Sequence, residues 1–328
     1  MKKSNRNPAL FREMGMIGAI LLLCLFVQIR NSNFFTWENV DDVLTNTAIL
    51  SILSVGMMMV IITRGIDLSL GSTLALAGMV TTKVMIVYPG LPIPLAFLMG
   101  IGIGTLCGFI VGAMVSWGNV PPIIASMGMM NAYRGITFLV SDGQWVSAHQ
   151  MTNPFKAIAT GRFLGINNLV LIAVLIFIVA YVFLQHTNPG RRIYAVGSNP
   201  EAADVSGIPV KRILCMVYMI MGALSGLCGI LWVSKYASAQ GNTAAGYEMS
   251  VIAACVLGGV SVDGGSGRIG GLILGGLFYG ILSNSLPMLN VSAFWQQSIQ
   301  AVIILMAIIL NVLIKRRMDF MNAKRRKI

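Results

Sequence analysis

Long uninterrupted runs of apolar residues recur along the chain and are separated by short polar segments. About 20 consecutive apolar residues form a helix that crosses the ~30 Å hydrocarbon core of a bilayer. The run at 249–260 is too short to cross alone, so it either borrows neighbouring residues or forms a broken, re-entrant element. The pattern predicts about ten membrane spans, at residues 14–29, 43–63, 70–87, 92–116, 121–140, 166–185, 213–233, 249–260, 269–285 and 294–314.

The composition agrees with a membrane protein. Of the 328 residues 56% are hydrophobic and 10% are charged, whereas soluble domains carry about 25% charged residues. Transmembrane β-strands alternate apolar and polar residues, whereas these runs are continuously apolar. Helices satisfy their backbone groups internally, as lipid requires. We therefore expect an all-α polytopic membrane protein with about ten transmembrane helices, forming a single transmembrane domain over residues 1–328.

The positive charge of the chain is arranged by membrane side. A net charge of +12 could indicate nucleic-acid binding, but most of the 23 Lys and Arg residues lie at the chain ends and between apolar runs. The positive-inside rule then places both the N- and C-termini in the cytoplasm, and no nucleic-acid partner is expected. Arg191 and Arg192 suit contacts with membrane lipid head groups or a role as topology anchors. Six basic residues fall outside or near the outer ends of spans: Arg30, Lys83, Arg134, Lys156, Arg162 and Lys235.

Two connections are unusually long. The segment Ser141 to Gly165 is assigned to the outside, where it either meets a soluble partner or merely links two spans. The segment His186 to Arg212 is assigned to the cytoplasm. These two loops are the best candidates for surfaces that a partner recognises.

The inner loop contains a complete helix signature. Asn199 suits the N-cap, Pro200 the first helical position, and Glu201 the positive N-terminal end. Gly207 suits the left-handed residue beyond the helix. The predicted helix has about two turns and is marginal in isolation, so either the ends of its own spans or a bound partner must hold it.

Several kinds of chemistry are absent from the sequence. No G-x-x-x-x-G-K-[ST] segment is present to cradle ATP phosphates, so ATP hydrolysis would need a separate subunit. No G-x-S-x-G or H-E-x-x-H segment occurs, and the only two histidines are assigned to opposite membrane sides. We expect no enzymatic activity, no metal and no cofactor in this chain. The five cysteines all lie inside apolar runs, as small core residues: Cys24, Cys107, Cys215, Cys228 and Cys255.

The acidic residues weigh against proton coupling. None of the 11 Asp and Glu residues lies in the middle of a predicted span, where proton-coupled transporters usually place an ionisable group. Sodium coupling through backbone carbonyls remains compatible with the sequence.

Glycines recur at helical spacing in the fourth span. Gly100, Gly104, Gly108 and Gly112 are followed in the same register by Ser116. A smooth strip of this kind lets another helix backbone approach closely. A second strip follows later, at Gly267, Gly271 and Gly275, with Gly276 and Gly280 beside it.

Two connections between spans resemble each other, at 64–72 and 258–268, because each places one aspartate among Gly and Ser residues. They are either cytoplasmic turns with Asp as a helix cap or broken helix ends that line a passage. Arg134, inside the fifth run, either snorkels outward or faces a polar interior. Our candidates for a solute pathway are Asp67, Ser69, Asn131 and Arg134.

Three segments carry a family resemblance. They are GIDLSLGS at 65–72, NPEAA at 199–203 followed by VSG at 205–207, and AACVLGGVS at 253–261. In this order they resemble the permease subunits of sugar-importing ATP-binding cassette (ABC) transporters of the ribose, galactose and xylose type. The charged Asp263 and Arg268 depart from the pattern that we expect of the family.

The resemblance implies a transmembrane permease domain of the bacterial inner membrane with a cytoplasmic coupling loop at 186–212. It implies three partners: an ABC ATPase, an extracytoplasmic sugar-binding protein, and a second permease subunit that is identical or different. The alternative is a secondary transporter or facilitator that needs no ATPase. The resemblance implies that the docking residues are Asn199, Pro200, Glu201, Ala202, Ala203 and Gly207.

Overall fold

A computed structural model describes residues 8–292, 294–296, 298–306 and 309. Its long helices are α1 (Pro8–Arg30), α2 (Trp37–Ile62), α3 (Leu70–Val87), α4 (Ile93–Ser116), α5 (Pro122–Ser141), α7 (Asn168–His186), α10 (Val210–Tyr236) and α12 (Ile269–Met288). The shorter elements are η1 (Ser32–Phe35), η2 (Ala148–Gln150), α6 (Asn153–Thr160), β1 (Arg162–Phe163), β2 (Ile166–Asn167), α8 (Asn188–Ser198), α9 (Pro200–Val205) and α11 (Tyr247–Leu257).

The all-α polytopic class is confirmed, with fewer full spans than the predicted ten. Among the described residues, eight helices are long and apolar enough to cross a membrane. The run at 249–260 forms α11, which has 11 residues and is therefore only about 16 Å long. The run at 294–314 lies partly outside the described residues. By its length α11 does not cross the membrane alone, as its short run predicts.

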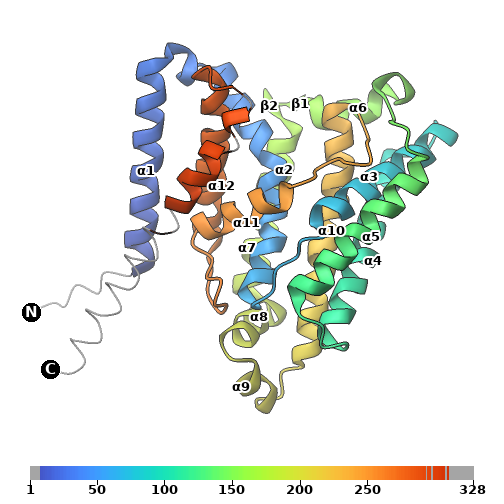
Figure 1. Cartoon of the computed structure of the whole chain (residues 1–328), viewed down its shortest axis with the longest axis vertical. Helices are drawn as coiled ribbons and strands as arrows, with labels where there is room; N and C mark the ends of the chain where they lie inside the picture. Colours follow the sequence, from blue (N-terminus) through green and yellow to red (C-terminus); the bar gives the residue numbers. More distant parts are fainter. Residues whose placement is uncertain (1–7, 293, 297, 307–308, 310–328) are drawn as a thin grey trace, which may run out of the picture.

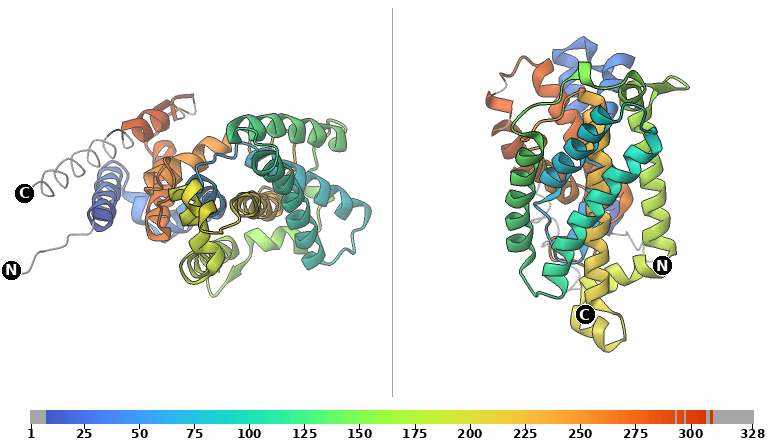
Figure 2. Two further views of the ribbon diagram at one scale, coloured as in Figure 1. Left: turned by 90° about the horizontal axis from the view of Figure 1, so that it is seen from below. Right: turned by 90° about the vertical axis from the view of Figure 1, so that its right-hand side faces the viewer.

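Helix α10 lies at the centre of the bundle, where α2, α3 and α4 pack against it. Its side chains Tyr218 and Met221 are completely buried in the main core. Figure 1 shows α1 and α12 together at one side of α2, with α4 and α5 at the other. The two views in Figure 2 show the same elongated arrangement from below and from the side.

The glycine strip of α4 lies against α10. A Cβ atom added to Gly104 would overlap the carbonyl oxygen of Gly222, and one added to Gly108 would overlap that of Tyr218. Gly222 and Gly226 of α10 make matching close approaches to α4. The two backbones therefore touch, and both helices supply the small residues that allow it.

The structure places the two kinds of loop at opposite ends of the bundle. α8 and α9 lie at the end where α1 begins, and the loops 31–36 and 142–167 lie at the other end (Figure 1). The side chain of Asn31 donates to the carbonyl of Met288 at 3.0 Å, which joins the outer ends of α1 and α12. The positive-inside rule predicts that the end with α8 and α9 faces the cytoplasm, and we name it the cytoplasmic end on that basis.

The outer loop is folded onto the bundle. Phe155 of α6 is buried beside outer residues of α3, α4 and α10. The Ser234 hydroxyl donates to the Phe155 carbonyl at 2.7 Å and accepts from the Ala159 amide at 3.0 Å. The short hairpin β1-β2 then leads into α7. This packing leaves little of the loop as an independent flexible linker.

Candidate functional site

Helix α9, in the loop 186–212, has the caps that its sequence predicts. Asn199 is extended at φ −154°, and its side chain accepts from the Ala202 amide at 3.0 Å. Gly207 has φ +78°, and its amide donates to the Asp204 carbonyl at 2.9 Å. The next amide reaches back to the Ala203 carbonyl at 3.0 Å, which completes a Schellman ending. The helix has six residues, slightly under two turns.

The surface of α9 is open to solvent. Glu201, Ala202 and Asp204 are exposed, and Val205 is 91% exposed. Ala203 is buried and holds the helix to the rest of the loop. In Figure 1 α9 projects furthest from the bundle at the cytoplasmic end. The described chain thus presents two apolar side chains, Ala202 and Val205, and two acidic ones on a short, capped helix.

The link between α2 and α3 is buried, in contrast to a surface turn. It runs from the cytoplasmic end of α2 back into the bundle (Figure 1), so that Leu74 in the first turns of α3 already meets Gly229 of α10. Asp67 is 2% exposed. One of its carboxylate oxygens accepts from the Ser69 amide at 2.8 Å and from the Ser69 hydroxyl at 2.6 Å.

This burial favours one of the two interpretations that the sequence leaves open for this connection, a broken helix end inside the protein, over an exposed turn. The chain turns back into the bundle before α3 begins, and the Asp67 carboxylate lies inside. The similar connection at 258–268 stays at the cytoplasmic surface, where Asp263 is exposed. Two similar sequences therefore adopt different depths.

Helix α5 joins the buried link to a second irregular segment, residues 237–246. The Ser126 hydroxyl donates to the Ile66 carbonyl at 3.2 Å. Arg134 donates from Nη1 to the carbonyls of Gly241 and Thr243, at 2.9 and 2.7 Å. The guanidinium thus faces a polar interior built from backbone, and it does not snorkel outward.

Asn131 does not join the other pathway candidates. It is exposed, and its side-chain amide donates to the Met127 carbonyl of its own helix at 3.0 Å. Asp67, Ser69 and Arg134, by contrast, are all tied to the two irregular segments that α5 bridges. The structure therefore pairs Asp67 with Ser69 and places Arg134 against the other segment, residues 237–246.

Two residues near the link were not among the predicted site residues. Glu248, in the first turn of α11, is 8% exposed, and its carboxylate lies 3.1 Å from where a Cβ atom on Gly71 would be. The hydroxyl of Tyr218 is buried beside Gly65 and has no hydrogen-bond partner within the described part of the chain. The sequence offered one signal for Glu248, because this acid immediately precedes an apolar run that is too short to cross the membrane. It offered none for Tyr218, which lies in a long apolar run like any core residue.

A pocket of about 290 Å³ lies beneath the link at the cytoplasmic end. None of its lining side chains is charged, and its polar groups are hydroxyls and one amide. The lining residues are Thr63, Gly65, Val115, Asn119, Val120, Pro121, Pro122, Leu214 and Tyr218.

The fold defines a multi-pass helical membrane protein with irregular segments between some of its spans and a short, capped helix at one end of the bundle. Residues 39–310 match the family described as branched-chain amino acid transport system / permease component, and the chain belongs to this family. Its members are transport components, which places the chain in the cytoplasmic (inner) membrane as a permease.

Curated relatives cover almost the whole chain. The ribose import permease protein RbsC of Escherichia coli strain K12 is 38% identical over 93% of this chain and 95% of its own. RbsC of Bacillus subtilis is 37% identical over 92% of each chain. The autoinducer 2 import system permease protein LsrC of Photorhabdus luminescens is 32% identical over 92% of this chain and 89% of its own. No solved structure matches.

Proposed function

We propose that this chain forms the translocation path of an ABC importer for a monosaccharide or a related small sugar, and that a separate ATPase subunit drives it. The family description refers to branched-chain amino acids, whereas two of the relatives compared above import ribose. Because the alignments with the ribose import permeases cover almost the whole chain, they favour a sugar over an amino acid as the substrate. The uncharged lining of the cytoplasmic pocket also suits a neutral sugar better than a zwitterion.

The geometry of α9 carries the proposal of a separate ATPase. Helix α9 has only six residues and makes few contacts with the bundle. It is nevertheless capped at both ends and exposes Val205 almost fully. An exposed apolar side chain flanked by acids suits a groove with an apolar floor and a basic rim. Residues 186–212 then act as the coupling loop of a single permease domain over 1–328. The residues that would contact the ATPase are Asn199, Pro200, Glu201, Ala202 and Gly207. Ala203 would hold the helix in place.

The remaining partners follow from the other exposed surfaces. An extracytoplasmic sugar-binding protein would meet the outer end, where the loop 142–167 is folded into a firm surface. A second permease subunit would complete the path. Inside, Asp67, Ser69 and Arg134 hold the two irregular segments that would border the path, and Asn131 lies on the outward face of α5.

The test is purification of the tagged chain from its native host in mild detergent, followed by identification of the proteins that co-purify. We expect a P-loop ATPase with the wild type and its loss in Val205→Lys, which places a charge on the docking surface. Val262→Lys is the matched control, because Val262 is an exposed valine on another cytoplasmic turn.

The substrate class is tested in proteoliposomes with the purified complex. The sugar proposal predicts uptake of labelled ribose that is suppressed by unlabelled ribose and not by leucine. Uptake of labelled leucine that is suppressed by unlabelled leucine and not by ribose would favour an amino acid. Solute movement by the lone chain without any ATPase would support the secondary-transporter alternative.

A further inference from the structure

Helix α2 ends in an unusual way. The Gly65 amide donates to the Val60 carbonyl and the Arg64 amide to the Ile61 carbonyl, both at 2.9 Å. These are the two bonds of a Schellman ending, whose left-handed position normally holds glycine. Here Arg64 takes that position with φ +65°, and the glycine follows one residue later. Backbone strain of this kind in a non-glycine residue persists where surrounding contacts fix it, often at functional positions.

The contacts that fix Arg64 lie at the base of the docking helix. Its Nε donates to the Gly197 carbonyl at 2.8 Å and its Nη2 to the Ser198 carbonyl at 2.6 Å. These are the last two residues of α8, and the next residue, Asn199, caps both α8 and α9. The cation thus sits at the C-terminal, partially negative end of α8, one residue from α9.

Backbone contacts tie a third segment to the same point. The Ile62 carbonyl accepts from the Gly265 amide at 2.9 Å. A Cβ atom on Gly197 would overlap that same carbonyl, and one on Gly264 would overlap the Arg64 side chain. The ends of α2 and α8 and the turn 258–268 therefore meet without intervening side chains.

Tyr194 of α8 adds a further bond to this junction. Its hydroxyl donates to the Gly267 carbonyl at 3.0 Å. Burial raises the pKa of the Tyr194 hydroxyl above its ordinary value, against the opposing effect of Arg268. This bond therefore ties α8 to the turn 258–268 at a second point.

On its other side, Arg64 begins the buried link. The next residue, Gly65, lies against the Tyr218 hydroxyl, and Asp67 follows two residues later. A displacement of the base of α9 would therefore reach the end of α2 through the backbone contacts of this junction and, at the residue that begins the link, through the Arg64 guanidinium.

We propose that Arg64 is a positioning residue that couples movement of the docking helix α9 to the interior link 63–69. This inference rests on the proposed function, because α9 must be moved by a docked ATPase. A guanidinium that merely stabilised the fold would leave the amount of solute moved per ATP unchanged, whereas a coupling residue sets that ratio.

The test replaces Arg64 without disturbing the backbone. Arg64→Gly accepts φ +65° and removes both side-chain bonds, and Arg64→Lys keeps the charge with a single ammonium group. The control, Arg192→Gln, removes a different arginine at the same end of the bundle. Arg192 lies in α8, and glutamine is a good helix former. Each variant is purified with its ATPase and reconstituted, and solute uptake and ATP hydrolysis are both measured.

We expect Arg64→Gly to assemble and hydrolyse ATP while its uptake per ATP falls about tenfold, as the loss of charge-assisted bonds implies. Arg64→Lys should restore part of the ratio and Arg192→Gln should match the wild type. An unchanged ratio in Arg64→Gly, including a proportional loss of uptake and hydrolysis, would overturn the inference.

A second measurement needs no ATPase and so separates this inference from the proposed function. Spin labels at Val205→Cys and Val262→Cys, in a Cys24→Ser background, report the distance between α9 and the turn 258–268 in the chain alone. Both valines are exposed, whereas the other native cysteines are buried. We expect Arg64→Gly to broaden the distance distribution and Arg192→Gln to leave it unchanged. A distribution that Arg64→Gly leaves as narrow as the wild type would refute the coupling.

Discussion

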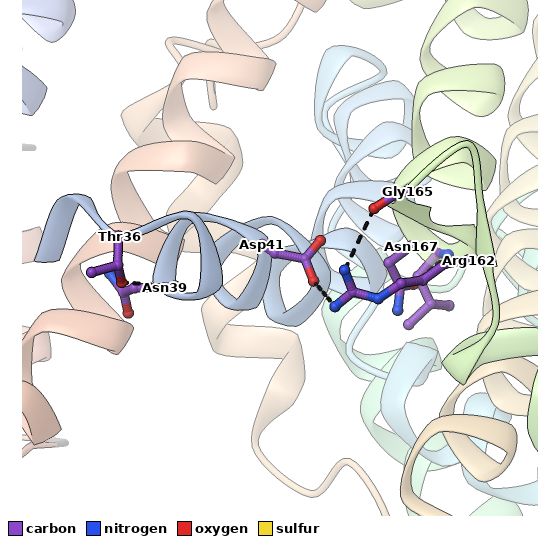
Figure 3. Close-up of polar contacts among 7 residues, drawn as sticks. Thr36, Asn39, Asp41, Arg162, Gly165 and Asn167 are labelled. Atoms are coloured by element: carbon purple, nitrogen blue, oxygen red, sulfur yellow. Dashed lines mark hydrogen bonds and ion pairs between the residues drawn. The ribbon is translucent and has the colours of Figure 1, made fainter. Parts of the chain in front are cut away.

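Arg162 and Asp41 form an ion pair at 2.6 Å, although 121 residues separate them in the sequence. Figure 3 shows Arg162 reaching from the outer hairpin to the second turn of α2. The same guanidinium donates to the Gly165 carbonyl at 3.5 Å, and Asn167 caps α7 by accepting from the Leu169 amide at 2.8 Å. The ion pair therefore fastens the hairpin and the start of α7 to α2.

The two partners of this pair differ in exposure, which makes their substitutions unequal. The Asp41 side chain is 10% exposed and that of Arg162 is 53% exposed. Arg162→Ala leaves a buried carboxylate without its counter-ion, whereas Asp41→Asn leaves a cation that water can solvate. We expect Arg162→Ala to cost about 1–3 kcal/mol and Asp41→Asn less than about 1 kcal/mol. Thermal unfolding in detergent measures both, and equal losses would contradict the argument.

The contact between α4 and α10 predicts a sharp difference between two neighbouring glycines. Gly104→Ala places a methyl group on the backbone of α10 and should destabilise the protein by about 1–3 kcal/mol. Gly102→Ala is the matched control, because a Cβ atom at Gly102 meets nothing within 4 Å. It should be neutral or slightly stabilising, since alanine favours helix more than glycine does. The midpoints of thermal unfolding in detergent compare the two, and a Gly104→Ala midpoint at or above that of Gly102→Ala would exclude tight packing here.

The N-cap of α9 should determine how well the docking helix is ordered before a partner binds. Asn199→Ala removes the bond to the Ala202 amide and should cost the helix about 1 kcal/mol. If docking requires an ordered α9, affinity for the ATPase should fall about fivefold. Asn199→Ser retains a capping oxygen and should recover most of it. Binding of the purified ATPase to immobilised chain measures the effect, and equal affinities for Asn199→Ala and Asn199→Ser would argue against an ordered docking helix.

Substitutions at both ends of α9 provide a stronger version of this test. Gly207→Pro forces φ near −65° where the native value is +78°, and Glu201→Lys reverses the charge in the first turn. Both variants should insert normally, because neither residue lies in a span, and both should lose ATPase-dependent uptake. Normal uptake with normal co-purification of the ATPase would show that α9 is only a connector.

The features that follow local rules could be predicted from the sequence. Apolar runs located the long helices to within three residues, except that α1 and α2 begin six residues before their predicted runs. The segment from Asn199 to Gly207 contained its own caps. The depth of the link at 63–69 could not be predicted, because Asp67 and Asp263 have the same kind of neighbours in sequence. Only contacts with distant residues, such as Ser126 and Tyr218, distinguish the buried connection from the exposed one. The partners of Arg134 were hidden for the same reason, since they lie more than 100 residues away.

Arg134 offers the clearest test of the interior arrangement. Its two bonds hold the carbonyls of Gly241 and Thr243, which Arg134→Ala would leave without their donor. We expect faster amide hydrogen exchange across residues 237–246 in this variant and a loss of uptake, with docking of the ATPase unchanged. Asn131→Ala is the control on the same helix, because Asn131 bonds only to its own turn, and it should leave exchange in 237–246 as in the wild type. If Asn131→Ala and Arg134→Ala raised exchange equally, α5 as a whole would hold the segment in place. A selective effect of Arg134→Ala would instead locate the restraint at one guanidinium.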